Sequence, residues 1–145
     1  MPASGIKLAD ANVWLALAFS DHMHHESATG WFESQTDSSC ALCRLTQLAL
    51  LRHLTNAKIM GKFVQNQQQA WQAYDKFLND PRVIFLAEPV AIDVEFRGLS
   101  QSLSPSHHRW TDAYLAALAK LNAAQLVTFD QGFSSFAGLD LVLLA

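Results

Sequence analysis

Short apolar runs alternate along the chain with longer stretches in which apolar residues recur every three or four positions. The short runs predict β-strands, and the longer stretches predict amphipathic helices. The predicted strands are residues 6–9, 39–43, 83–86, 125–128 and 139–143. The predicted helices are residues 12–19, 24–34, 46–55, 64–79, 91–103 and 110–121. This alternation predicts an α/β fold, in which a parallel sheet of four to five strands is covered by helices on both faces.

The apolar faces of two of these helices can be specified from residue spacing. The helix at 46–55 has an apolar stripe at every third position, formed by Leu45, Leu48, Leu51 and Leu54. The glutamine-rich helix at 64–79 is expected to turn inward Trp71, Tyr74, Phe77 and Leu78. Between these two helices, residues 56–61 are predicted to be a turn-rich break.

Length and composition limit the class of protein. The chain has 145 residues, of which 50% are hydrophobic and only 16% are charged, so intrinsic disorder is excluded. We expect one domain over residues 1–145. The longest apolar stretches are too short to span a bilayer, and the start at Met1 lacks the apolar core of a signal peptide. These features predict a cytoplasmic protein without a membrane partner.

The formal net charge of −3 excludes the strong basic field of a sequence-indifferent nucleic-acid binder. It leaves room for an enzyme that meets phosphates with a local basic rim. The candidate rim residues are Arg44, Arg52, Lys58, Lys62 and Arg109. For any one of them, a scattered solubilising charge is an equally good explanation.

Cysteines and histidines do not form a convincing zinc site. Cys40 and Cys43 lie three apart on a predicted strand, so their side chains should face opposite sides and remain buried thiols. The six histidines include no pair at i, i+4 within a helix, the spacing of zinc hydrolases. We therefore expect the histidines to lie on the surface or in loops. His25 and His107 can still contribute to the rim of an active site.

Three aspartates occupy the positions where an α/β fold would place a metal site. Asp10 and Asp130 each follow a predicted strand, and Asp112 lies in the first turn of a predicted helix. Helix capping, the helix dipole or a turn explains each one singly. Ligands bind at the carboxyl ends of parallel strands, where these carboxylates would meet. Clustered carboxylates repel unless a cation joins them, and a site of oxygen ligands favours Mg²⁺ or Mn²⁺.

Other phosphate-handling folds lack their required residues. A haloacid-dehalogenase-like phosphatase needs an aspartate two residues after its nucleophile, where this chain has Asn12. A response-regulator receiver needs a lysine after its fifth strand, and the last lysine here is Lys120. The glycine-rich loops of nucleotide-binding folds do not occur either.

Six ordered stretches resemble the PIN-domain ribonucleases, in particular the VapC-type toxins of bacterial toxin–antitoxin pairs. The matching stretches are residues 8–15, 25–31, 43–47, 80–83, 111–119 and 127–133. The resemblance implies a three-layer α/β/α sandwich that gathers Mg²⁺ or Mn²⁺ on Asp10, Asp112 and Asp130 and cleaves RNA. It also implies a small antitoxin partner and a homodimer. Around the metal site, the auxiliary candidates are Asn12, Thr46, Gln47 and Thr128, and the RNA-contact candidates are Arg44 and Arg109.

One position departs from this family pattern. Many relatives carry a glutamate at the start of the third helix, where this chain has Gln47. An amide offers a carbonyl oxygen but no charge, which puts a second metal ion in doubt. Two rivals to a toxin ribonuclease therefore stay open: a hydrolase of small phosphate esters, and a PIN-like RNA- or protein-binding scaffold with impaired catalysis.

Overall fold

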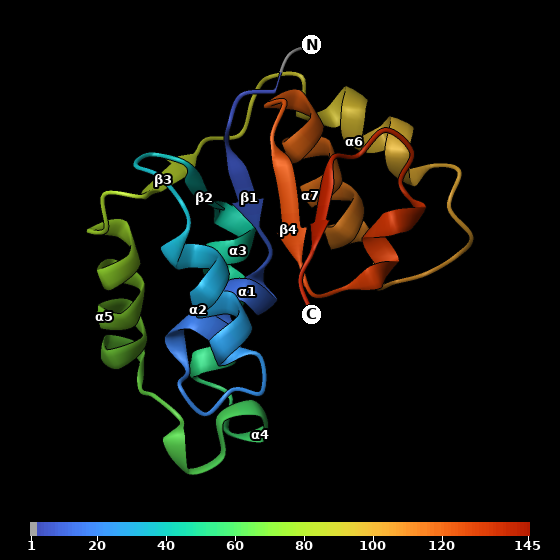
Figure 1. Ribbon diagram of the computed structural model, residues 1–145. Coiled ribbons are helices and arrows are strands. Elements are labelled where there is room, and N and C mark those ends of the chain that lie inside the picture. Colours follow the sequence, from blue (N-terminus) through green and yellow to red (C-terminus); the bar gives the residue numbers. More distant parts are fainter. Residues whose placement is uncertain (1–2) are drawn as a thin grey trace.

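The computed structural model describes residues 3–145, which form a five-stranded parallel sheet with helices on both faces (Figure 1). The strands are β1 Lys7–Ala9, β2 Cys40–Cys43, β3 Val83–Leu86, β4 Gln125–Thr128 and β5 Leu141–Leu143. Their order across the sheet is β3-β2-β1-β4-β5, and all four neighbouring pairs are parallel. The predicted three-layer α/β/α fold is therefore confirmed. Met1 and Pro2, at the start that was predicted to lack a signal peptide, lie outside the described residues.

All six predicted helices are present, with shifted ends. The helices are α1 Ala11–Ala18, α2 His25–Glu33, α3 Arg44–Leu54, α4 Ala57–Met60, α5 Gln67–Leu78, α6 Ile92–Ser100 and α7 Arg109–Leu121. Two 3₁₀ turns complete the described part of the chain, η1 Gly61–Phe63 and η2 Gln131–Ser135. Within residues 3–145, every helix falls short of the length and apolarity that crossing a lipid bilayer would require.

Two differences from the predicted helix boundaries have local causes. The predicted break at 56–61 contains α4, because Asn56 caps it by accepting a hydrogen bond from the Lys58 N–H. The helix predicted from residue 64 begins at Gln67 instead. Asn66 and Gln69 exchange hydrogen bonds between side chain and backbone N–H, and this capping box sets the start of α5.

The sheet separates two apolar cores. Successive residues of a strand point to opposite faces, so Leu8 and Ala9 of β1 lie in different cores. The first core is covered by α1, α2, α3 and α5, and the second by α6, α7 and η2 (Figure 1). Cys40 belongs to the first core and Cys43 to the second, and both are buried free thiols. The prediction that the two thiols face opposite sides is confirmed.

The predicted apolar stripe of α3 is wrong in part. Leu54 is buried, but Leu48 is 50% exposed, and Leu50 is fully buried in its place. A step of three residues turns a helix by about 300°, so a strict i, i+3 series drifts by about 60° per step. Over nine residues this drift carries the stripe to the opposite side of the helix. The buried face of α3 alternates three- and four-residue steps through Gln47, Leu50 and Leu54.

The predicted inward face of α5 is also wrong in part. Tyr74 is buried and Phe77 packs against the first core, as predicted. Trp71 and Leu78 are instead 48% and 41% exposed. The small residue Ala70 takes the inward position one turn before Tyr74, so the inward face of α5 follows Ala70, Tyr74 and Phe77 in steps of four and three residues.

Candidate metal centre

Asp10 joins the central strand to the first helix. It follows β1 and caps α1, with its Oδ1 accepting a hydrogen bond from the Ala11 N–H at 2.7 Å. Its own N–H donates to the Val127 carbonyl of β4 at 2.9 Å. The capping role predicted for Asp10 is confirmed. This arrangement fixes the Asp10 carboxylate at the carboxyl edge of the sheet, at the end of β1 and beside β4.

Thr128 is the centre of a buried hydrogen-bond network at this edge. Its hydroxyl donates to Asp10 Oδ2 at 2.9 Å and accepts from the Asp130 N–H at 3.0 Å and from Asn12 Nδ2 at 3.3 Å. One donor and two acceptor positions are all that a threonine hydroxyl offers, so it is saturated. Asn12 also accepts from the Phe129 N–H at 3.4 Å. Asn12 and Thr128 are thus built into the support of Asp10.

Asp130 follows β4 and caps η2. Its Oδ1 accepts a hydrogen bond from the Gly132 N–H at 2.8 Å. A Cβ atom at position 132 would lie 3.1 Å from that same Oδ1, closer than ordinary van der Waals contact. The absence of a side chain at Gly132 therefore leaves the room that the Asp130 carboxylate occupies.

Asp112 lies in the first turn of α7 beside Arg109. The Arg109 Nε is 3.5 Å from Asp112 Oδ2, and its Nη2 donates to Ser135 Oγ at 2.8 Å and to the Gly132 carbonyl at 3.3 Å. The guanidinium also lies over the Phe136 ring, 4.9 Å from its centroid. Arg109, predicted as an RNA contact, thus ties η2 to the start of α7. Its contact with RNA stays a prediction.

The three carboxylates share one electrostatic environment. Burial raises the pKa of Asp10 above its ordinary value, and hydrogen bonds from Thr128 and Ala11 oppose this, while repulsion from Asp112 and Asp130 adds to it. Burial and then repulsion from Asp130 raise the pKa of Asp112, opposed by Arg109 and His108. β1, β4 and α7 thus place the charges of Asp112 and Asp130 within electrostatic range of the Asp10 carboxylate.

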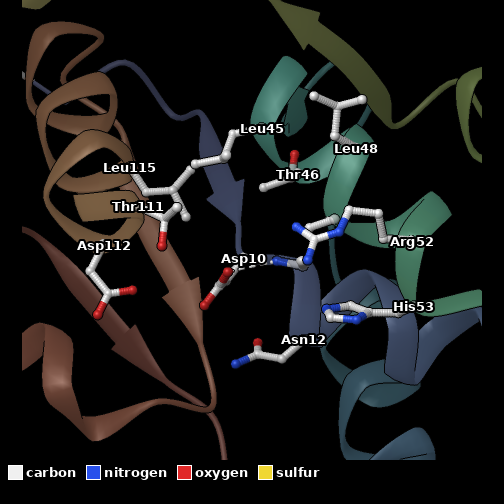
Figure 2. A pocket seen from close by; sticks show the side chains of 12 residues that line it. Asp10, Asn12, Leu45, Thr46, Leu48, Arg52, His53, Thr111, Asp112 and Leu115 are labelled. Carbon is white, nitrogen blue, oxygen red and sulfur yellow. Dashed lines mark hydrogen bonds between the residues drawn. The ribbon is translucent and has the colours of Figure 1, made fainter. Parts of the chain in front are cut away.

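A cavity of about 470 Å³ opens beside Asp10. In Figure 2, Asp10 lies between Thr111 and Asp112 on α7 and the side chains of Arg52 and His53 on α3. Asn12, Thr46, Leu45, Leu48, Ala49 and Leu115 also line the cavity, whereas Asp130 lies outside its lining. The cavity therefore presents the carboxylates of Asp10 and Asp112 opposite the side chains of Arg52 and His53.

His53 and Thr111 line this cavity but were not among the candidate residues predicted from the sequence. A helical signal was available for His53, since Thr46, Ala49 and His53 follow the i, i+3, i+7 pattern of one helix face. Thr111 immediately precedes Asp112 and carried no signal of its own. Arg52, one of the five candidate rim residues, does line the cavity.

Gln47 and Arg44 contact each other and aromatic residues of α5 and β3. Gln47 is buried outside the lining of the cavity, where its Oε1 accepts a hydrogen bond from Arg44 and its side chain contacts the Tyr74 hydroxyl. The Arg44 guanidinium lies over the Phe85 ring of β3. The auxiliary role predicted for Gln47 at the metal remains a prediction, and its side-chain contacts point elsewhere.

The histidines suggested for the rim have other neighbours. Nδ1 of His25 is 2.7 Å from the Ala16 carbonyl and links α2 to α1. His107 packs against His108 in a tilted arrangement, with ring centroids 3.7 Å apart, in the segment before α7. Both lie outside the lining of the cavity. Rim roles for His25 and His107 therefore gain no support from their positions.

The chemistry of these side chains fits a hard divalent cation. The three carboxylates are oxygen ligands of the kind that Mg²⁺ and Mn²⁺ prefer, and two of them, Asp10 and Asp112, line one cavity. Within residues 3–145, no three His, Cys, Asp or Glu side chains already stand at metal-ligand spacing. Asp112 is instead turned to Arg109, and Asp130 to the Gly132 N–H. Rotation of these two side chains would be part of metal binding.

Comparison with known proteins relates the chain to characterised families. The family model described as "PIN domain" matches residues 7–139. Ribonuclease VapC41 of Mycobacterium tuberculosis is 39% identical over 143 residues, covering 95% of this chain and 98% of that protein. The matched residues 7–139 include Asp10, Asp112 and Asp130.

Solved structures share the fold at lower sequence identity. VapBC2 from Rickettsia felis, bound to a DNA fragment from its promoter, matches with a TM-score of 0.70 and 17% identity over 97% of this chain and 99% of that chain. VapC20 of Mycobacterium tuberculosis, a toxin that cleaves the sarcin–ricin loop, matches with a TM-score of 0.68 and 16% identity over 92% and 95% of the two chains. Taken with the family match over residues 7–139, this chain belongs to the PIN-domain family.

Proposed function

We propose that this chain, as a single PIN domain over residues 1–145, is a metal-dependent endoribonuclease and the toxin of a toxin–antitoxin pair. One observation carries the proposal: Asp10 and Asp112 line one cavity, and Asp130 is close enough to both to raise their pKa values. The name of the VapC41 relative, a ribonuclease, supports RNA as the substrate. Cellular RNA as substrate implies a cytoplasmic protein.

Asp10, Asp112 and Asp130 would hold the cation, for which Mg²⁺ or Mn²⁺ is the best match to oxygen ligands. PIN-domain VapC nucleases are metal-dependent as a class. When bound, such a cation lowers the pKa of a water molecule and stabilises negative charge on the scissile phosphate. Thr128 and Asn12 keep the Asp10 carboxylate oriented, and Thr128 also holds the Asp130 backbone.

Arg52 and His53 line the α3 side of the cavity, opposite Asp112, and can bind the phosphates of RNA. The Arg52 guanidinium offers charged donors to a phosphate oxygen, which carboxylates alone would repel. Burial and then the neighbouring Arg52 charge lower the pKa of His53, so the imidazole is neutral at neutral pH and can donate or accept a hydrogen bond. These two residues would position RNA across the metal site.

Metal-dependent cleavage of RNA is the experiment that tests the function. We expect the purified protein to cut single-stranded or structured RNA with Mg²⁺ or Mn²⁺, and excess EDTA to stop the reaction. A chromogenic small phosphate ester, assayed in parallel, should not be turned over. Turnover of the ester alone would support the small-ester hydrolase. Binding of RNA without cleavage in either metal would support the impaired scaffold.

The proposed partner is a small antitoxin that reaches into the cavity lined by Asp10 and Asp112 (the acidic cavity). An arginine or lysine from such a protein can pair with Asp10 and Asp112, whose charges repel each other. We expect expression of the wild-type chain to arrest bacterial growth, and co-expression of the small reading frame beside its gene to restore growth. The Asp112→Ala chain should be harmless when expressed alone. If cells that express the wild-type chain grow normally and their RNA stays uncut, the chain is not a toxin.

The proposal includes a homodimer, which the resemblance to VapC-type toxins implied. Its mass in solution can be measured by light scattering at the concentrations used for RNA cleavage. A single species with the mass of one chain would remove the homodimer from the proposal without affecting the assignment of the nuclease.

A further inference from the structure

A second cavity of about 320 Å³ adjoins the acidic one. Its lining comprises Arg44, Leu45, Leu48, Glu88, Phe96, Trp110, Thr111 and Tyr114. Leu45, Leu48 and Thr111 line both cavities, and Figure 2 shows them on the α3 and α7 sides of the acidic one. An RNA strand that lies in the first cavity beside Asp10 and Asp112 can therefore continue directly into the second cavity.

The second cavity contains an exposed aromatic side chain on a rigid support. Trp110 is 58% exposed, although a residue of this size and apolarity usually loses most of its surface in the folded state. Phe96 of α6 packs edge-to-face against both Trp110 and Tyr114, with ring centroids 6.2 and 5.9 Å apart. Trp110 precedes Asp112 by two residues on α7, so the helix fixes the backbone of Trp110 relative to Asp112.

Two charged side chains give this apolar cavity a polar rim. The Arg44 guanidinium is held by its hydrogen bond to Gln47 and by its position over the Phe85 ring, 5.2 Å from the centroid. Glu88, before α6, accepts a hydrogen bond from the Tyr114 hydroxyl at 2.7 Å. The guanidinium can pair with a phosphate, and the carboxylate can accept hydrogen bonds from the N–H groups of a base.

We propose that the second cavity binds the nucleobase next to the scissile phosphate, stacked on Trp110. The assignment rests on the proposed endoribonuclease function. It adds a base-binding site for the part of the RNA strand that leaves the metal site. Single-stranded RNA is recognised chiefly by stacking its splayed bases on aromatic side chains, and an apolar cavity with a few polar groups suits one such base. Arg44 then pairs with the phosphate beside that base.

The test combines protein variants with RNA substrates that lack one base. The proteins are the wild type, Trp110→Ala, Trp110→Phe and Trp71→Ala, and the last is the matched control because Trp71 is also exposed but lies on α5, outside both cavities. Each protein cleaves a short single-stranded RNA and a set of copies with an abasic nucleotide at successive positions. Measuring kcat and KM separately distinguishes lost binding from lost chemistry.

We expect Trp110→Ala to raise KM for intact RNA by roughly 5- to 150-fold, the range for loss of one base stacked on an aromatic ring. An abasic nucleotide beside the cleaved bond should cost the wild type a similar factor and cost Trp110→Ala nothing further. Trp110→Phe should keep most of the affinity, and Trp71→Ala should match the wild type. Because Trp110 is largely exposed, all four proteins should melt within a few degrees of one another.

Other outcomes would overturn the assignment. A Trp110→Ala protein that cleaves intact RNA like the wild type, or that loses the same factor as the wild type at every abasic position, would show that Trp110 does not stack on a base. Loss of antitoxin binding with unchanged RNA kinetics would assign the cavity to a protein segment instead. A wild type that cleaves no RNA in either metal would overturn both this assignment and the proposed function.

Discussion

Replacing Asp112 with asparagine is expected to lower metal-dependent RNA cleavage by at least about 100-fold while the protein stays folded. Changes to residues that merely orient a metal ligand typically cost 10- to 100-fold, and Asp112 is proposed as a ligand itself. The asparagine Oδ1 can still face Arg109, whose other contacts to Gly132 and Ser135 remain. Cleavage rates at saturating Mg²⁺ check the result, with Asp75→Asn on the exposed face of α5 as the control of equal charge. Full metal-dependent activity in the variant would remove Asp112 from the site.

The equivalent change at Asp10 adds a pH-dependent effect on stability. Burial holds the pKa of Asp10 above its ordinary value near 3.8, so ionisation of this group opposes folding in the absence of metal. Its stability contribution is fully present below pH 4 and is lost as the pH rises through the raised pKa. Asparagine cannot ionise, and its Oδ1 can still accept from the Ala11 N–H.

We therefore expect the Asp10→Asn protein in EDTA to gain thermal stability over the wild type as the pH rises from about 4 to 7. Differential scanning calorimetry of both proteins across that range measures the difference in Tm. Cleavage by the variant should be lost to the same degree as for Asp112→Asn. A difference in Tm that shrinks with rising pH would mean that the ionised carboxylate stabilises the fold through its two hydrogen bonds more than burial destabilises it.

The features that sequence analysis predicted correctly depend on a few neighbouring residues. A short apolar run followed by a capping residue placed Asp10 between β1 and α1. The same signal at Thr128 and Asp130 placed the second carboxylate at the end of β4. Parallel strands bring their carboxyl ends to one edge of the sheet, so these local signals were enough to bring the two aspartates together.

The features that sequence analysis could not predict depend on contacts between distant segments. Arg109 was predicted as a rim residue and RNA contact, and no local signal pointed to its hydrogen bond to Ser135 Oγ, 26 residues away along the chain. Gln47 was assigned from a motif, which specifies a residue type but not the direction of its side chain. Because α3 begins at Arg44, Gln47 lies one turn after that arginine and accepts its hydrogen bond. The direction in which a side chain of a helix points is set by how that helix packs in the tertiary structure.

The hydrogen bonds of Thr128 are both local and long-range. Asp130 lies two residues away in the sequence, whereas Asp10 and Asn12 lie more than a hundred positions away. Valine has nearly the same shape but no hydroxyl, so Thr128→Val should leave the packing of β4 intact. The Asp130 N–H and Asn12 Nδ2 would lose their acceptor, and Asp10 Oδ2 its donor. Unmet hydrogen bonds at a fully buried position cost about 1–3 kcal/mol of unfolding free energy.

We expect the Thr128→Val protein to cleave RNA roughly 10- to 100-fold more slowly, because the Asp10 carboxylate is no longer held in one orientation. Part of that loss should be recovered at high Mg²⁺ concentration, since a mobile ligand weakens metal binding before it abolishes chemistry. Denaturant unfolding and a Mg²⁺ titration of the cleavage rate measure the two effects. Thr55→Val is the matched control, because its hydroxyl donates to the Leu51 carbonyl at the end of α3, away from the carboxylates. If Thr128→Val loses stability but keeps the Mg²⁺ dependence of the wild type, Thr128 supports the fold at this edge without orienting Asp10 for metal.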